Sequence, residues 1–238
     1  MSVNLKAAGL VDGALDALLP SHCLLCGARG QGALSLCAEC AAEMPRNAMC
    51  CVRCALPLDA PAPLCGRCIR HPPPWNAAWV PFRYEWPLAQ LESRFKFGGD
   101  LAAGRTLSLL WLASRPPEEM PKALVPVPLH RARLRRRGYN QALELAKPLA
   151  KRFAVPLLHD ALCRARATDA QTELTAVQRR RNVRGAFEAN FSGTPPEHVA
   201  VLDDVFTTGA TLAECARVLK QAGVARVDVW ALARAPAR

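Results

Sequence analysis

The segment from Val199 to Thr211, VAVLDDVFTTGAT, combines residue types that could bind a sugar phosphate. Its apolar first half predicts a buried strand that ends in two adjacent carboxylates, Asp203 and Asp204. A short turn and the start of a helix follow, formed by Thr207, Thr208, Gly209, Ala210 and Thr211. Backbone N–H groups at such a turn, together with the positive end of the helix, form a cup for a phosphate monoester.

The two carboxylates would repel a phosphate at close range. We therefore expect Asp203 and Asp204 to accept hydrogen bonds from sugar hydroxyls, directly or beside a metal ion. The alternative is an ordinary strand–loop–helix in which Thr207 or Thr208 caps the helix. The combination of paired acids with the TTGAT turn favours a ribose 5-phosphate site.

Cysteines form a second set of potential ligands. Eight of the 11 lie in four C-x-x-C pairs that begin every 14 residues: Cys23/Cys26, Cys37/Cys40, Cys51/Cys54 and Cys65/Cys68. Two thiolates three positions apart can bind one side of a tetrahedral ion, and a second pair completes a four-thiolate zinc shell. Four pairs predict two zinc ions. Four thiolates leave no open position for a substrate, which favours a structural role over a nucleic-acid contact.

The linkers between the pairs bear on which cysteines share an ion. The first linker (27–36) is rich in glycine and the third (55–64) holds three prolines, so both resemble turns or hairpins. The middle linker begins with a helix-prone stretch at 41–44. This favours sequential pairing, with the first two pairs at one ion and the last two at the other. An interleaved arrangement stays open.

Positive charge is concentrated in one quarter of the chain. The net charge is +11, and residues 129–184 alone hold 14 basic and four acidic side chains, a net +10. A focused basic field attracts phosphates, whether on a small ligand or on a nucleic acid. A merely solubilising face would mix both signs.

The elements that must position these residues alternate along the chain. After a proline linker at 72–74, we expect strands at 78–84, 123–127, 156–164, 185–189, 199–202 and 227–232. Helices are expected at 87–97, 102–113, 139–153 and 210–222. Such alternation predicts an α/β fold with an open, mostly parallel sheet, in which ligands bind at the carboxyl ends of the strands.

A length of 238 residues allows one or two domains. We divide the chain into an amphipathic helix at 1–20, a cysteine-rich module at 21–71 and an α/β domain at 75–238. No run of 18 apolar residues is present, so no membrane span is expected. The apolar stretch near the start lacks a basic leader and a cleavage site, so we expect a cytoplasmic protein whose cysteines bind metal.

Two resemblances add to these predictions. Residues 199–211 resemble the phosphoribosyl pyrophosphate (PRPP) signature of type I phosphoribosyltransferases. The whole chain resembles the ComF family, through the cysteine pairs, FKFGGD at 95–100, VPVP at 125–128, RGYNQ at 137–141, QTEL at 171–174 with Arg179 and Asn182, and the PRPP signature. The resemblance implies a link to natural competence and to the handling of imported single-stranded DNA.

The first resemblance implies roles for individual residues. Asp203 and Asp204 would bind the ribose hydroxyls, and Thr207, Thr208, Gly209, Ala210 and Thr211 the 5-phosphate. Mg²⁺ would accompany PRPP and help to stabilise the departing pyrophosphate. Related purine enzymes carry an aspartate base where this chain has Thr207, which cannot act as a base. Purine salvage is therefore doubtful, and the acceptor is not specified.

The basic segments suit the departure of pyrophosphate. Residues 130–141 follow a strand and are expected to form a pyrophosphate-binding loop, with Arg137 as the favoured catalytic cation. Residues 166–181 resemble a loop that closes over PRPP. Lys96 is a further candidate for contact with the site.

Three functions follow. The first is a phosphoribosyltransferase, or at least a PRPP-binding protein. The second is a non-catalytic single-stranded DNA-binding protein, whose stacking candidates are Trp75, Trp79, Tyr84, Trp86 and Tyr139. The third is an adaptor whose cysteine-rich module docks a partner such as a DNA-uptake helicase.

Overall fold

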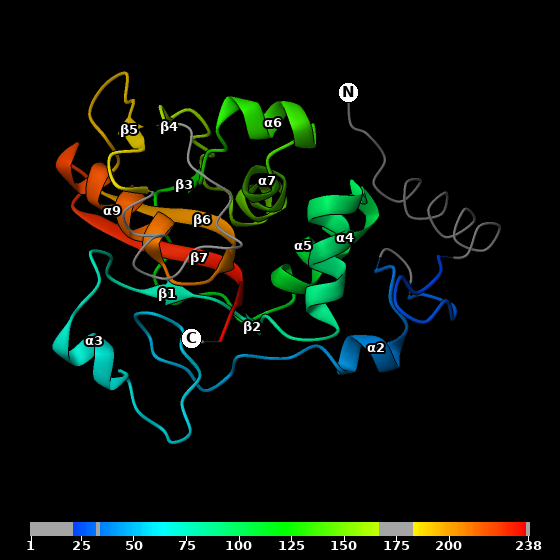
Figure 1. The fold of residues 1–238 in the computed structure, drawn as a ribbon. Helices are drawn as coiled ribbons and strands as arrows, with labels where there is room; N and C mark the ends of the chain where they lie inside the picture. Colours follow the sequence, from blue (N-terminus) through cyan, green and yellow to red (C-terminus); the bar gives the residue numbers. More distant parts are fainter. Residues whose placement is uncertain (1–20, 32–33, 167–182, 237–238) are drawn as a thin grey trace, which may run out of the picture.

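The computed structural model describes residues 21–31, 34–166 and 183–236 (Figure 1). The helix expected at 1–20 lies outside the described residues. The same holds for nearly all of the loop expected at 166–181, and for the motif at 171–174 with Arg179 and Asn182.

A parallel sheet forms the centre of the molecule. Strand β6 (His198–Phe206) lies between β3 (Ala123–Pro126) and β7 (Arg226–Arg234), and the short strands β1 (Ala78–Trp79) and β2 (Phe82–Arg83) pair with the outer side of β7. Nearly every residue of the three central strands is buried. Burial at successive positions requires cover on both faces, which explains why these strands are continuous apolar runs.

The helices supply this cover. α7 (Gln141–Phe153) packs on β3 and β6, and α9 (Ala210–Gln221) packs on β6 and β7. α5 (Leu101–Leu112) packs against α7 on one side and against α4 (Leu88–Gly98) on the other. Short helices are α2 (Ala38–Ala42), α3 (Gly66–Arg70) and α6 (Arg131–Arg137).

The FKFGGD segment forms the corner between α4 and α5. Gly99 ends α4 in the left-handed conformation (φ 66°), which a residue with a side chain adopts at a cost. Asp100 then caps α5 by accepting a hydrogen bond from the Ala103 N–H at 3.0 Å, and pairs with Arg94 at 2.7 Å. The corner fixes the direction of α4, which carries Lys96.

Four expected elements differ in the structure. The strand predicted at 78–84 is divided into β1 and β2, since Pro81 cannot donate to the ladder. The strand predicted at 156–164 is divided: Leu157 makes an isolated parallel bridge to Leu124 of β3, whereas residues 162–164 form β4 and pair antiparallel with β5 (Phe187–Ala189) in a separate sheet. Strand β6 continues through both aspartates to Phe206. Residues 131–137, expected to be a loop, form helix α6 because His130 and Gly138 cap its two ends.

The cysteine-rich module lies against the sheet and α4 (Figure 1). The Asn47 amide donates to the carbonyls of Ala55 and Val80 at 2.9 and 3.1 Å, which joins the module to the edge of the sheet. Arg94 on α4 donates to the Leu24 carbonyl. The module is thus attached to the α/β part at both of its halves.

Candidate functional site

The two aspartates lie near the carboxyl end of β6, and the turn at 207–209 leads from there into α9. Asp204 is buried, and Asp203 is partly exposed. The Asp203 carboxylate accepts a hydrogen bond from the Asp204 N–H at 3.0 Å, and the Asp204 carboxylate accepts one from the Val205 N–H at 2.7 Å. The strand therefore carries two consecutive carboxylates near its carboxyl end.

Lys96 on α4 reaches the acidic pair. Its ammonium nitrogen lies 2.8 Å from Asp204 Oδ2 and 3.1 Å from Glu92 Oε1. The Tyr84 hydroxyl donates to the other Glu92 oxygen at 3.1 Å. A chain of contacts therefore runs from Tyr84 through Glu92 and Lys96 to Asp204.

These contacts shift the pKa values of the two aspartates in opposite directions. Burial and the neighbouring Asp204 carboxylate raise the pKa of Asp203 well above its ordinary value. Burial alone would raise the pKa of Asp204 too, but Lys96 outweighs it and lowers that pKa. Burial by itself lowers the pKa of Lys96, and the two carboxylates raise it above its ordinary value. Lys96 therefore stays charged, and Asp204 is its ionised partner.

The turn after β6 leads directly into the N-terminus of α9. Gly209 adopts the left-handed conformation (φ 76°) and precedes α9 without a side-chain cap. The Ala210 N–H donates to the Thr208 hydroxyl at 3.3 Å. A side chain at Gly209 would place its Cβ 2.7 Å from the Phe206 ring and 3.1 Å from the Trp75 ring. Thr207, Thr208, Gly209, Ala210 and Thr211 are thus gathered at one helix start beside the aspartates.

Two arginines outside α4 bear on the candidate site, Arg164 and Arg137. Arg164 on β4, which the sequence analysis missed, lies within electrostatic range of Asp203 and of Arg133. Arg137 instead donates to the Gln141 side chain at 3.0 Å and lies over the Phe97 ring. No contact joins Arg137 to either aspartate among the described residues. Only the tertiary structure reveals Arg164, because β4 is distant from β6 in sequence.

The eight cysteines gather into two groups of four: Cys23, Cys26, Cys37 and Cys40, and Cys51, Cys54, Cys65 and Cys68. This is the sequential grouping. Within each group all four sulfur atoms lie within 4.8 Å of one another. The Sγ atoms of Cys26 and Cys37 are 3.6 Å apart, as are those of Cys54 and Cys65. Both distances are close to the separation of about 3.8 Å between two sulfur atoms in a tetrahedral zinc–thiolate site. The groups therefore fit two structural zinc ions.

Backbone amides favour the thiolate in each group. Burial raises the pKa of Cys23 and Cys51, but hydrogen bonds from the knuckle N–H groups outweigh it and lower these pKa values to about 6 and about 7. One cysteine of each group is therefore favoured as a thiolate, the form that binds zinc, whereas burial and the neighbouring cysteines raise the pKa of Cys40, Cys54 and Cys68.

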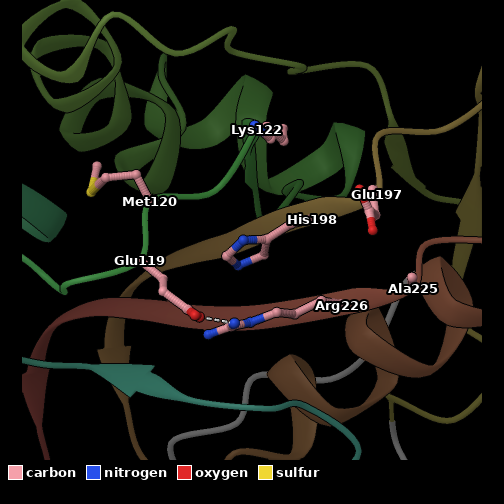
Figure 2. Close-up of a pocket in the computed structure, with 7 residues that line it drawn as sticks. All are labelled: Glu119, Met120, Lys122, Glu197, His198, Ala225 and Arg226. Carbon is pink, nitrogen blue, oxygen red and sulfur yellow. Dashed lines mark hydrogen bonds and ion pairs between the residues drawn. The ribbon is translucent and has the colours of Figure 1, made fainter.

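A separate pocket of about 430 Å³ lies at the amino ends of β6 and β7, away from the aspartates (Figure 2). It is lined by Glu119, Met120, Lys122, Glu197, His198, Ala225 and Arg226. Arg226 pairs with Glu119 and Asp228, and His198 contacts Asp228 at 2.9 Å. Because these charges already compensate one another, the pocket does not match an anionic ligand.

Comparison with known proteins gives a consistent family. Residues 14–69 match the double zinc ribbon domain family. The chain is 39% identical to competence protein F of Haemophilus influenzae over 175 residues, which are 70% of this chain and 76% of that protein. It is 36% identical to the DNA utilization protein YhgH of Escherichia coli K12 over 172 residues, 70% and 75% of the two chains. Competence protein ComFC of Streptococcus pneumoniae is 28% identical over 157 residues, which are 64% of this chain and 66% of that protein.

Fold and site together define an α/β protein with a mostly parallel sheet and an N-terminal double zinc ribbon. The chain belongs to the ComF family. Its relatives link it to competence and DNA utilization. Within the described residues, no helix is both long and apolar enough to span a membrane.

Proposed function

We propose that this chain binds PRPP with Mg²⁺ where β6 leads into α9, and that it is a phosphoribosyltransferase-like protein acting in DNA uptake or use. The observation that carries the proposal is the acidic pair, Asp203 and Asp204, followed after the turn at 207–209 by the N-terminus of α9, where Gly209 itself offers no side-chain cap. Paired acceptors beside an anion cup match a sugar diol that carries a terminal phosphate.

The donor set fits the parts of PRPP. Carboxylate oxygens accept hydrogen bonds from ribose hydroxyls, and the N-terminal turn of α9 attracts the 5-phosphate. Arg164 lies within electrostatic range of both Asp203 and Arg133, so it adds positive charge near the acidic pair. Bound Mg²⁺ would neutralise charge on the pyrophosphate.

The chain's own residues would bind and orient the ligand. Asp203 and Asp204 fix the ribose ring, and the turn at 207–211 fixes the phosphate, which together set the direction of the anomeric carbon. Thr207 supplies no base for an acceptor, so the proposal assigns positioning to this chain and leaves the acceptor unnamed.

A calorimetric titration with PRPP and Mg²⁺ tests the proposal. We expect binding by the wild type and a loss of at least about tenfold in affinity for Asp204→Asn, since a charged hydrogen bond is removed. Asp160→Asn is the matched control, because the Asp160 carboxylate is 81% exposed. Absence of binding by the wild type would reject the proposal. A binding result leads to a screen for pyrophosphate release with candidate acceptors.

A specific surface favours a second candidate function, the binding of single-stranded DNA. Helix α6 carries five arginines, and beside it Phe97 is 68% exposed with Arg137 over its ring. Exposed aromatic and arginine groups together suit base stacking and phosphate contact. Three of the stacking candidates from the sequence are engaged elsewhere: Trp79 packs against Trp111 and Trp230, Tyr84 bonds Glu92, and Tyr139 bonds the Phe95 carbonyl. Trp75 is buried, and Trp86 is exposed.

Fluorescence anisotropy with a single-stranded oligonucleotide tests this surface. We expect affinity that falls steeply with salt and is weakened about tenfold by Phe97→Ala. Ile69→Ala is the control, because Ile69 is equally exposed but lies in the second ribbon. Equal effects of both substitutions would exclude α6 and Phe97 as the DNA surface.

A further inference from the structure

Lys96 is an internal cation of the candidate site. Its side chain is mostly buried, and its ammonium group contacts Asp204 and Glu92 at 2.8 and 3.1 Å. Both acids are themselves buried. Removing a charged group from water is unfavourable unless it is paired, so Lys96 is held in place by the acids it neutralises.

The hydrogen bonds of Asp204 leave little room for a metal ion. One carboxylate oxygen accepts from the Val205 N–H at 2.7 Å, and the other contacts Lys96. A divalent cation at Asp204 would have to displace the ammonium group. Magnesium also gives up its bound water reluctantly and prefers sites with several waters and phosphate oxygens. The hydrogen bond from the Val205 N–H is made by the strand backbone, so that carboxylate oxygen of Asp204 is held in a fixed position.

We propose that Lys96 takes the place of a divalent cation at Asp204, so that the ribose 5-phosphate end of the ligand binds without magnesium. The metal is then needed only by the pyrophosphate. This inference rests on the proposed function and adds a positioning residue to it. Glu92 and Tyr84 support this position of Lys96. Glu92 accepts hydrogen bonds from the Lys96 ammonium group and the Tyr84 hydroxyl, which keeps the ammonium group directed at Asp204.

Ribose 5-phosphate without pyrophosphate is the appropriate probe. Calorimetry on the full-length wild type is carried out after exhaustive dialysis into magnesium-free buffer, which leaves the zinc in place, and again with excess Mg²⁺. We expect the two dissociation constants to agree within about twofold. Binding that requires Mg²⁺ would overturn the inference, and this result needs no variant protein.

Substitutions at Lys96 provide a second measurement. Lys96→Met should weaken ribose 5-phosphate binding at least about tenfold without Mg²⁺, with partial recovery when Mg²⁺ is added, since the ion can then reach Asp204. Lys96→Arg should retain magnesium-independent binding. Lys147→Met is the control, because Lys147 is an exposed lysine that pairs with Glu144 in its own helix. Identical binding by Lys96→Met and the wild type in both conditions would overturn the inference.

A parallel titration with PRPP and Mg²⁺ separates this inference from the proposed function. If the wild type binds PRPP with Mg²⁺ but fails the ribose 5-phosphate test, the role of Lys96 is wrong and the proposed function stands. If the wild type binds neither ligand, the proposed function and the inference are both wrong.

Discussion

The guanidinium group of Arg234 joins Cys54 to Thr207. It donates to the Cys54 carbonyl at 2.9 Å and to the Thr207 carbonyl at 2.6 Å. The same side chain donates to the Phe206 carbonyl and lies over the Phe206 ring. Arg234 ends β7 and is buried. One side chain therefore connects the second zinc site to the turn of the candidate ligand site.

Loss of zinc from the second site should weaken ligand binding. We expect Cys65→Ser to disorder the Cys51–Cys68 knuckles, release the Cys54 carbonyl and reduce PRPP affinity several-fold. The measurement is zinc content by atomic absorption together with calorimetry. Cys37→Ser, in the first zinc site, is the matched control and should affect PRPP affinity less. Equal reductions by both variants would contradict a specific link through Arg234.

Arg234→Met should destabilise the protein strongly. The substitution removes a buried cation and leaves the carbonyls of Cys54, Phe206 and Thr207 without this donor, at a cost of roughly 2–4 kcal/mol in the free energy of unfolding. Urea unfolding measures it. Arg115→Met is the control, since Arg115 is 87% exposed and should change the free energy by less than about 0.5 kcal/mol. A small effect at Arg234 would show that the carbonyls find other donors.

The neighbouring aspartates should have opposite effects on stability. The folded state raises the pKa of Asp203, so its ionisation at neutral pH is unfavourable, and Asp203→Asn should stabilise the protein at neutral pH. The folded state lowers the pKa of Asp204, so its contribution is present above the ordinary aspartate pKa and is lost as the pH falls through the lowered value. Asp204→Asn should therefore destabilise at neutral pH.

Urea unfolding of both variants at neutral pH and near pH 4 checks these signs. The stabilisation by Asp203→Asn should shrink toward about pH 4, where the wild-type carboxyl is already protonated in the folded state. Effects of the same sign at neutral pH would contradict the assignment of Lys96 to Asp204.

Gly209→Ala should lower the stability of the protein by more than the cost of its positive φ alone. Positive φ costs roughly 1 kcal/mol for alanine, and the new Cβ would also lie 2.7 Å from the Phe206 ring. Gly185→Ala is the matched control, with φ 64° and no atom within 4 Å of the added carbon. Thermal melts of both variants should show the larger loss at Gly209, accompanied there by weaker PRPP binding. Equal losses would mean that the Phe206 ring moves aside freely.

The local patterns of the sequence determined much of this structure. Apolar runs predict the central strands, because residues buried on both faces of a parallel sheet are apolar without interruption. The regular C-x-x-C spacing predicts two four-cysteine groups, because each pair must reach the same ion from a short knuckle. Only two residues separate the Asp203–Asp204 pair from the TTGAT turn, so their proximity at one strand end is also predictable.

Contacts between distant segments were decided by the tertiary structure alone. The pairing of Lys96 with Asp204 depends on how α4 packs against the sheet, and Arg234 reaches Cys54 only because β7 ends beside the second ribbon. Arg137 is directed toward Phe97 because residues 131–137 form a helix between His130 and Gly138. Sequence patterns record which face of an element is buried, whereas the partner of a buried charge is chosen by packing over long chain separations.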